Sequence, residues 1–227
     1  MKRPSYFIAG VVSMVLSTCF ITPAQAQDEE TASKFSAGLE FYSNYVWRGS
    51  KLGTGPSVQP AVQFQSNGLT IGVWGAFDAD GYAEADPYIS YSFPFGLSLG
   101  VTDYYYPDQD LFDASIGSGS HALELNAGYG IGGFSLSANY IVNEAGGAAS
   151  AGGDMYFQAG YDCEHVSLFV GGGNGWHTVD GDFNICNIGI GTSTEIQVTD
   201  KFSFSVNGQV IVNPDREKLY LVGGISF

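Results

Sequence analysis

The sequence has few basic residues, few cysteines and only one long hydrophobic run. Its 227 residues include eight Lys and Arg against 23 Asp and Glu, and three Cys. So acidic a chain is a poor partner for nucleic acid, because phosphate backbones are bound by Lys and Arg. After residue 26 no segment has apolar residues at the spacing of a helix, so no helix is predicted there. The content of 32 Gly, 14 Tyr and 16 Phe excludes a chain that is disordered throughout.

The hydrophobic run lies at the N-terminus and predicts an export signal. Lys2 and Arg3 precede an apolar stretch at 6–21, and Ala24-Gln25-Ala26 ends it. This order is typical of a secretory signal peptide cleaved before Gln27. A membrane anchor is less favoured, because Ser and Thr interrupt the stretch.

We divide the chain into a signal peptide (1–26), a polar lead-in (27–33) and one domain (34–227). Cleavage would leave six basic against 23 acidic residues, a formal charge of −17, which fits an exported protein with a cation-attracting surface. Cys163 and Cys186 belong to the domain. An even count in an exported protein favours a disulfide, but the strand pattern places the two at opposite ends, so we predict that they are not bonded.

The stretch from Phe35 to Asp78 shows the pattern that the whole domain repeats. Apolar and polar side chains alternate along it, which predicts strands with one apolar and one polar face. The same alternation predicts twelve strands, at 34–48, 57–66, 69–79, 83–93, 97–106, 120–129, 134–142, 154–163, 166–173, 183–198, 202–212 and 218–227.

The connections between these strands differ in length at the two ends of the domain. Short turns such as Asn67-Gly68 and Gly132-Gly133 precede a repeated apolar–Ser/Thr–apolar unit. Longer connections rich in Gly, Asp and Pro, such as 107–118 and 144–153, lie at the other end. Such asymmetry is typical of a transmembrane barrel with short periplasmic turns and longer outer loops.

The apolar face of the strands decides between a soluble and a membrane fold. A sandwich could bury this face, whereas the interior of a twelve-stranded barrel is too wide for side chains to fill. Strands near ten residues suit tilted membrane spans. We also expect two aromatic girdles, formed by Phe35, Phe64, Phe93, Tyr161 and Phe202 at one rim and by Tyr45, Trp47, Phe77 and Tyr105 at the other. The prediction is an all-β, closed antiparallel transmembrane β-barrel of twelve strands, with a soluble sandwich as the alternative.

The last predicted strand indicates where the protein is located in the cell. The chain ends on an amphipathic segment from Leu219 to Phe227. A terminal strand ending in Phe resembles the assembly signal of bacterial outer-membrane proteins. Together with the signal peptide it predicts the bacterial outer membrane as location, with the membrane lipid and, through Phe227, the outer-membrane assembly machinery as partners.

A segment within the first 78 residues resembles a known family. It comprises Ser43-Asn44-Tyr45-Val46-Trp47-Arg48-Gly49-Ser50, then Pro56, then Gln59-Pro60-Ala61-Val62-Gln63 and Gly68 to Trp74. This segment is similar to the N-terminal signature of the TorF-type porin family. The resemblance implies an outer-membrane β-barrel of the porin kind. The connection Lys51 to Gly55 is longer than in such relatives and the loop tips are acidic, so no substrate preference is transferred.

Arg48 is the one basic residue expected on an inward face well inside a strand. It would pair with a carboxylate of the lumen such as Glu40 or Asp78. The pair would either set up a transverse field at a constriction or, as we favour, act as a structural ion pair at the outer end of the first hairpin.

Two sets of inward side chains would determine what the lumen admits. The carboxylates expected there are Glu40, Asp78, Glu84, Asp86, Glu124 and Glu195, with Asp154 and Asp162 beside them. They would make an open lumen prefer cations, or would be hydrated at the mouths of a filled one. The aromatic residues expected there are Tyr42, Trp74, Tyr88, Tyr104 and Tyr156. They would narrow or block the lumen, or stack on a sugar or nucleoside.

Catalysis and metal binding have weaker support. His177 lies near Asp180 and Asp182 in a Gly-rich connection, which permits acid–base chemistry. No activated Ser motif accompanies it, and the candidate ligands have no fixed spacing. We therefore predict no enzyme, no catalytic residue, no cofactor and no metal site.

The leading hypothesis for function is a porin-like channel for passive diffusion of small polar solutes, with a preference for cations. The alternative is a non-conducting structural or interaction barrel with acidic outer loops. Both small polar and bulky aromatic residues are expected in the lumen, so the sequence leaves the choice open.

Overall fold

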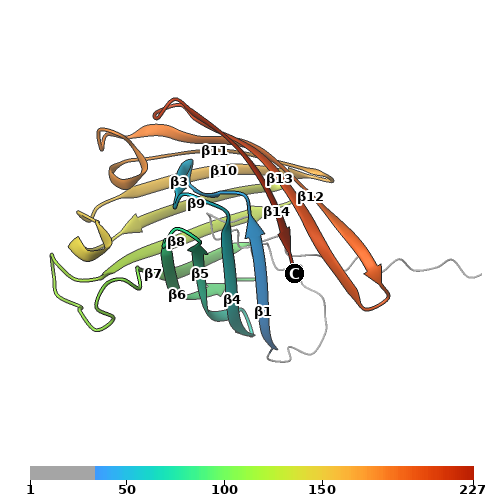
Figure 1. Ribbon diagram of the computed structural model, residues 1–227, viewed down its shortest axis with the longest axis horizontal. Coiled ribbons are helices and arrows are strands. Elements are labelled where there is room, and N and C mark those ends of the chain that lie inside the picture. Colours follow the sequence, from blue (N-terminus) through green and yellow to red (C-terminus); the bar gives the residue numbers. More distant parts are fainter. Residues whose placement is uncertain (1–33) are drawn as a thin grey trace, which may run out of the picture.

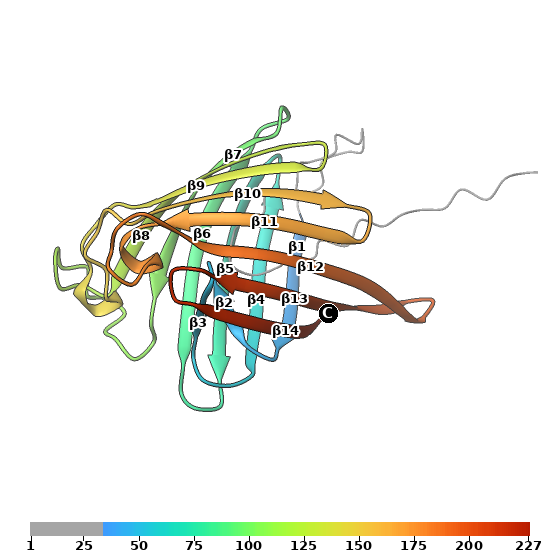
Figure 2. The same ribbon diagram turned by 90° about the horizontal axis from the view of Figure 1, so that it is seen from above.

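The computed structural model describes residues 34–227, which form a closed antiparallel barrel of twelve strands (Figure 1). Figure 2 shows the same barrel from above, with the strands steeply inclined to one another. The strands are β1 (Lys34–Tyr42), β4 (Ser57–Ser66), β5 (Leu69–Asp78), β6 (Ala83–Ser92), β7 (Leu97–Tyr105), β8 (His121–Ile131), β9 (Phe134–Ile141), β10 (Met155–Cys163), β11 (Val166–Gly173), β12 (Asn184–Thr199), β13 (Phe202–Asn213) and β14 (Lys218–Ser226). The predicted fold class is confirmed.

Consecutive barrel strands pair with each other, and the two ends of the chain close the ring. β1 pairs with β4 along its whole length, from Lys34 opposite Gln65 to Tyr42 opposite Ser57. On its other edge β1 pairs with β14 at Glu40–Tyr42, and Leu39 and Phe227 exchange backbone hydrogen bonds beside this pairing. The signal peptide and lead-in predicted for residues 1–33 lie outside the described residues.

Short turns and long connections separate to opposite ends of the barrel. Asn67 and Gly68 join β4 to β5 with φ angles of 50° and 84°. Positive φ at both central residues is the type I′ geometry that matches the twist of a hairpin. The connections at the other end include 106–120 and 142–154, and they carry the two short 3₁₀ helices η1 (Gly146–Ala148) and η2 (Gly175–His177). The predicted asymmetry is therefore present.

The apolar face of the strands points outward and is exposed. Large apolar residues on it belong to neighbouring strands around the ring, among them Val62, Ile71, Leu99, Leu125, Leu136, Leu168, Ile190 and Leu221. A soluble sandwich would bury this face, so that alternative is wrong. Soluble proteins rarely expose so continuous an apolar surface without a partner to cover it.

The buried residues lie inside the barrel, and many of them are polar. Glu84, Glu124, Gln59, Asn213 and His177 each have no more than 1 % of their surface exposed. Burial of polar groups is costly unless they are hydrogen-bonded or paired. The interior is thus an organised polar core toward the long-connection end, where the hydrophobic clusters of buried residues also lie.

The predicted first strand, 34–48, is not one strand. The chain leaves the barrel wall after β1, bends at Ser43 and Asn44, and forms a separate hairpin of β2 (Tyr45–Trp47) and β3 (Ser50–Leu52). Tyr45 is 2 % exposed and Trp47 is half-buried. Their expected place in an outer aromatic girdle is therefore wrong, because the bend carries both side chains into the lumen.

The two cysteines lie near opposite ends of their strands, and both are free. Cys163 is exposed at the last position of β10, next to a short turn, whereas Cys186 is buried near the start of β12. Within the described residues, no helix is long and apolar enough to cross a membrane.

Candidate functional site

The β2–β3 hairpin lies inside the barrel and its tip crosses the lumen. We call residues 45–52 the plug. Trp47 and Ser50 pair across a two-residue turn in which Arg48 has a φ of 48° and Gly49 a φ of 82°. The turn places Arg48 against β8, which lies across the barrel from β1 in the order of strands. The plug therefore spans the lumen near its long-connection end.

Arg48 and Glu124 form a buried, bidentate ion pair at this tip. Arg48 Nη1 donates to Glu124 Oε1 at 2.6 Å, and Nη2 donates to Oε2 at 2.8 Å. Tyr104 and Asn126 also donate to Glu124 Oε2, at 3.0 and 2.6 Å. Two parallel N–H···O bonds fix both the distance and the orientation of a guanidinium. The predicted inward position of Arg48 is present, but its partner is Glu124 and not Glu40 or Asp78.

Aromatic rings and a histidine surround the guanidinium. Its carbon lies 4.6 Å from the ring centroid of Tyr156 and 4.7 Å from that of Trp47. Arg48 Nη1 is 3.5 Å from His177 Nε2, which suits a neutral imidazole that accepts at this nitrogen. Burial lowers the pKa of His177 well below its usual value, and the charges of Arg48 and Arg216 lower that pKa further.

The turn of the plug fits closely against β12. A Cβ at Gly49 would lie 1.9 Å from the carbonyl oxygen of Cys186, so only glycine fits here. Asn213 donates to the Gly49 carbonyl at 2.9 Å, and Arg216 Nε donates to Ser50 Oγ at 3.2 Å. The plug is thus held from β12 and from the β13–β14 connection as well as from β8.

A layer of aromatic residues closes the space beside the ion pair. The ring of Trp47 contacts those of Tyr104, Trp176 and His177, with centroids 5.5, 5.8 and 5.0 Å away. Trp176 is fixed in turn by Asp154, whose Oδ1 accepts from the Trp176 backbone N–H at 2.9 Å. Asp154 therefore orders the β11–β12 connection and does not line an open pore.

A chain of polar side chains continues the site around the wall. Asn126 donates to Asn139 at 3.0 Å, and Asn187 donates to the hydroxyl of Tyr156 at 2.9 Å. Tyr156 donates to Gln158 Oε1 at 2.7 Å. These bonds link β8 to β9 and β10 to β12 at the level of the plug.

A second acidic group lies on β6. Glu84 and Asp86 are both buried, two residues apart on the same inward face. Tyr82 donates to Glu84 Oε2 at 2.7 Å, and Trp74 stands opposite Asp86 on β5. Among the ion pairs of residues 34–227, none involves Glu84 or Asp86.

The other predicted lumen residues are dispersed. Glu40 is buried beside the closing seam and accepts from Ser226 at 3.0 Å, with the buried Tyr42 two residues away. Tyr88 is half-buried and donates to Gln63 at 2.9 Å. These side chains face inward as expected but do not touch the plug's ion pair.

Asp78 is not a lumen residue, whereas Glu195 has the predicted inward direction, accepts from Ser203 and lies close to the short turns. Asp78 accepts from the backbone N–H groups of Thr54, Asp80 and Tyr82 at 2.8, 3.0 and 2.9 Å. It orders two connections at the rim. Glu195 and Asp162 are exposed, far along β12 and β10 toward the short turns.

Sequence reasoning missed the roles of Trp47, Trp176 and His177, and also the fit of Gly49. A signal for the plug was present in Arg48-Gly49, a dipeptide that suits a turn with positive φ. The region of residues 34–227 contains no group of three His, Cys, Asp or Glu that could hold a metal ion.

Above the plug, the ends of the long connections surround a cavity of about 970 Å³, which we call the vestibule. Its floor includes Trp47, Ser50 and Leu52 of the plug. The vestibule opens away from the short turns, because its wall residues come from the connections at the other end of the barrel.

Comparison with known families identifies the family of this chain. Residues 26–183 match a family model described as "Bacterial protein of unknown function (Gcw_chp)". The chain belongs to the Gcw_chp family. The Gcw_chp match includes the plug, Glu124 and His177, whereas Asn213 and Arg216 lie beyond it. The TorF-type resemblance is not confirmed by this match.

Other comparisons add little to the Gcw_chp assignment. No curated protein matches the chain. Among solved structures, a mutant of the porin from Rh. blastica is similar over 75 % of this chain, with 14 % sequence identity and a TM-score of 0.40. The alignment spans 55 % of that porin's chain.

Proposed function

We propose that this protein is a small-solute channel of the bacterial outer membrane that its own plug closes at rest. The exposed apolar belt around the barrel supports a place in lipid, since only a closed barrel satisfies all backbone hydrogen bonds of membrane-spanning strands. The observation that carries the proposal is the Arg48–Glu124 pair, which ties a hairpin across the lumen.

The half of the lumen below the plug has the lining of a water-filled passage. Small polar residues face inward near the short turns, including Ser90, Ser92, Ser135, Ser137, Ser167, Ser193 and Ser203. Small polar linings are typical of barrels that pass solutes. The plug and the rings packed on it lie between this half and the vestibule.

We further propose that the open passage prefers cations and admits small polar solutes by passive diffusion. The buried carboxylates Glu40, Glu84 and Asp86 have no ion-pair partner within residues 34–227, and the one basic residue deep in the lumen, Arg48, is neutralised by Glu124. Uncompensated acids in a lumen favour cations.

A non-conducting barrel is the second candidate. The closed aromatic layer of Trp47, Tyr104 and Trp176 favours it, because such a layer is also what a permanently filled lumen would contain.

Planar-bilayer recording of the refolded protein in a KCl gradient tests these proposals. We expect discrete but infrequent conductance steps, with a reversal potential on the cation-selective side. Replacing both Glu84→Gln and Asp86→Asn should move the reversal potential toward zero, whereas Glu164→Gln, which alters an 89 % exposed carboxylate in a short turn, should not. Heat-modifiable gel mobility verifies that the barrel is folded. If such folded protein shows no conductance, and variants with the plug released show none either, the non-conducting candidate is supported.

A further inference from the structure

The vestibule is built from every connection at its end of the barrel. Besides the plug, its lining includes residues 81–83 between β5 and β6, 106, 108 and 109 after β7, 147–149 at η1, 176 and 179 around η2, and 215–218 and 220 at the β13–β14 connection and the start of β14. A volume of about 970 Å³ lies at the upper end of the range of sites for small organic ligands. The cavity therefore has the size of a binding site.

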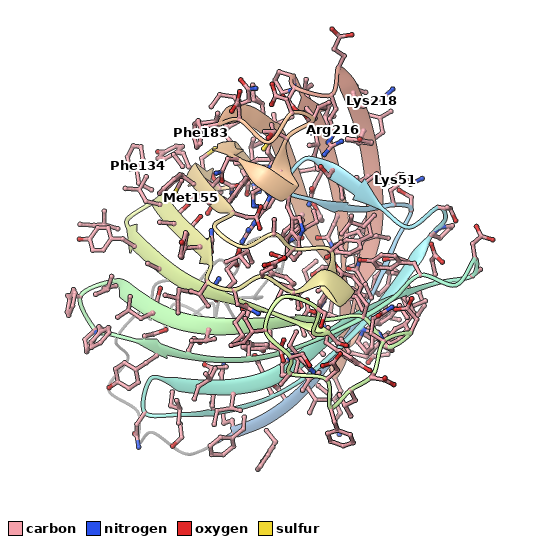
Figure 3. The ribbon with its side chains drawn as sticks, turned by 90° about the vertical axis from the view of Figure 1, so that its left-hand side faces the viewer. Lys51, Phe134, Met155, Phe183, Arg216 and Lys218 are labelled. Carbon is pink, nitrogen blue, oxygen red and sulfur yellow. The ribbon has the colours of Figure 1, made fainter. Side chains whose placement is uncertain are left out.

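Basic residues are concentrated around this cavity. The described chain has six Lys and Arg and twenty Asp and Glu. Three of the six basic residues, Lys51, Arg216 and Lys218, line the vestibule, and they lie close together at one side of the mouth in Figure 3. The remaining three are Arg48 in its ion pair, and Lys34 and Lys201 at the short-turn end.

The three cations are not neutralised by the protein. Lys51 Nζ donates to the Thr54 carbonyl, and Arg216 donates to Ser50 Oγ and to the Thr178 carbonyl. None of the three forms an ion pair with a carboxylate in the part of the chain that the structure describes. These three positive charges have no carboxylate partner among the described residues although acids outnumber basic residues in the chain, so they can attract an anionic ligand.

The same lining contains three acids, of which Asp215 is engaged by neutral donors. Asp215 accepts from the Val179 backbone N–H at 2.8 Å and from the Asn184 amide at 3.1 Å. Asp108 and Glu217 are exposed. The lining thus contains three of six described cations but only three of twenty described acids.

Flat apolar surfaces are exposed in the same hollow. Trp47, Trp176, Tyr82 and Tyr106 line it and are each half-buried. The indole of Trp176 is oriented by a hydrogen bond from Nε1 to the Ala149 carbonyl at 2.7 Å, and it packs on Trp47 with centroids 5.8 Å apart. Fixed rings of this kind stack on planar ligands at little cost in conformational entropy.

We propose that the vestibule binds an organic anion with a flat ring, whose charged group meets Lys51, Arg216 and Lys218 and whose ring stacks on the indoles. Such a ligand is an occupant of the mouth and not the transported solute, because the buried carboxylates Glu40, Glu84 and Asp86 of the lumen repel anions. It contacts Trp47, Ser50 and Lys51 only while the plug is seated, so binding stabilises the closed state. This coupling to closure rests on the proposed function, whereas binding itself does not.

Calorimetric titration of the refolded full-length domain in lipid nanodiscs tests the site, with 2-naphthoate, 2-naphthylmethanol and inorganic phosphate as probes. We expect 2-naphthoate to bind at least tenfold more tightly than the neutral alcohol, and phosphate to bind more weakly than 2-naphthoate. Lys218→Gln should weaken 2-naphthoate roughly tenfold, since one charge-assisted contact is lost. Lys201→Gln, which removes the same charge at the other end, should leave binding unchanged.

Several results would overturn the proposal. Equal affinity for the naphthoate and the alcohol would mean simple partition into an apolar surface. Equal weakening by Lys218→Gln and Lys201→Gln would mean unspecific attraction, and absence of binding to the folded protein would exclude the site. Conductance that 2-naphthoate does not reduce would refute the coupling alone. Binding of 2-naphthoate by a protein that never conducts would support the site and reject the channel.

Discussion

At the scale of single residues, Glu124 is the position on which the plug most depends. Glu124→Gln leaves the guanidinium of Arg48 buried without a counter-charge, and loss of one partner of a buried pair costs about 3–5 kcal/mol. We expect a loss of this order in the free energy of unfolding, measured by urea titration in lipid vesicles with tryptophan fluorescence.

Two variants control this measurement. Glu195→Gln alters an exposed carboxylate and should change stability by no more than about 0.5 kcal/mol. Arg48→Met combined with Glu124→Met removes both charges and should recover much of the loss. Equal costs for Glu124→Gln and Glu195→Gln would contradict the burial of the pair.

His177 makes the folding stability of the protein depend on pH. Its pKa is lowered in the folded protein by burial and by Arg48 and Arg216. The unfolded chain therefore binds a proton below about pH 6.5 that the folded protein rejects, and stability falls with decreasing pH by about 1.4 kcal/mol per pH unit in that window.

The measurement is urea unfolding of the wild type and His177→Gln between pH 7.5 and 5. The stability of the wild type should fall relative to the variant as the pH drops below 6.5, and the difference should be constant above it. Parallel curves over the whole range would mean that His177 titrates normally.

The direction of single side chains was predictable from the sequence, whereas their partners were not. Alternation alone placed Glu84, Asp86, Glu124 and Tyr156 inward, because side-chain direction in a strand has a period of two. It could not identify Glu124 as the partner of Arg48, since that pairing depends on a bend that turns residues 45–52 out of the wall. Asp78 was wrongly expected in the lumen for a related reason. Its carboxylate accepts from backbone N–H groups of two connections, and the sequence pattern does not show where those connections meet.

At the scale of elements, the seating of the plug can be followed through Cys186. This thiol is buried in β12, where the backbone contacts Gly49. In a Cys163→Ser background we expect slow labelling of Cys186 by a polar thiol reagent. Gly49→Ala should accelerate labelling by tenfold or more, because its Cβ collides with the Cys186 carbonyl and unseats the turn.

Gly223→Ala is the matched control for that experiment. It adds the same methyl group where nothing lies within 4 Å, so labelling should stay slow. Heat-modifiable gel mobility verifies that both variants keep the barrel. Rapid labelling of Cys186 in the unmodified plug would contradict a seated hairpin.

The outward face of β9 tests whether the strands have the assigned orientation. Leu136 is the third residue of β9, 59 % exposed, and lies between Tyr129 and Ala159 on neighbouring strands. Leu136→Arg should cost about 2–4 kcal/mol in lipid if the residue is near the bilayer midplane. Ile131→Arg, near a short turn, should cost about 0–1 kcal/mol. Similar costs at the two positions, measured by urea unfolding, would contradict this placement.

The strand boundaries were largely predictable from the sequence, and the exception is instructive. Eleven of the predicted strands need little correction, since turn residues such as Asn67-Gly68 and the two-residue period coincide there. The first predicted strand failed because alternation continues through the bend at Ser43 and Asn44. A periodic pattern reports which side chains share a face and does not report where the backbone leaves the sheet.

At the scale of the whole molecule, the barrel contains three layers with different chemistry. Acidic groups and small polar side chains line the lumen, the plug closes it, and the vestibule beyond the plug holds half of the described basic residues. The sequence predicted the barrel and its acidity. It could not predict the vestibule, because six connections far apart in the chain meet there only in the folded structure.

The central claim, that the plug closes a channel, is tested most directly by single-channel recording of the wild type beside Gly49→Ala and Gly223→Ala in planar bilayers. We expect brief, rare openings for the wild type and Gly223→Ala, and long-lived open steps for Gly49→Ala, whose turn no longer fits β12. Identical traces for all three folded proteins, whether equally open or equally silent, would contradict it.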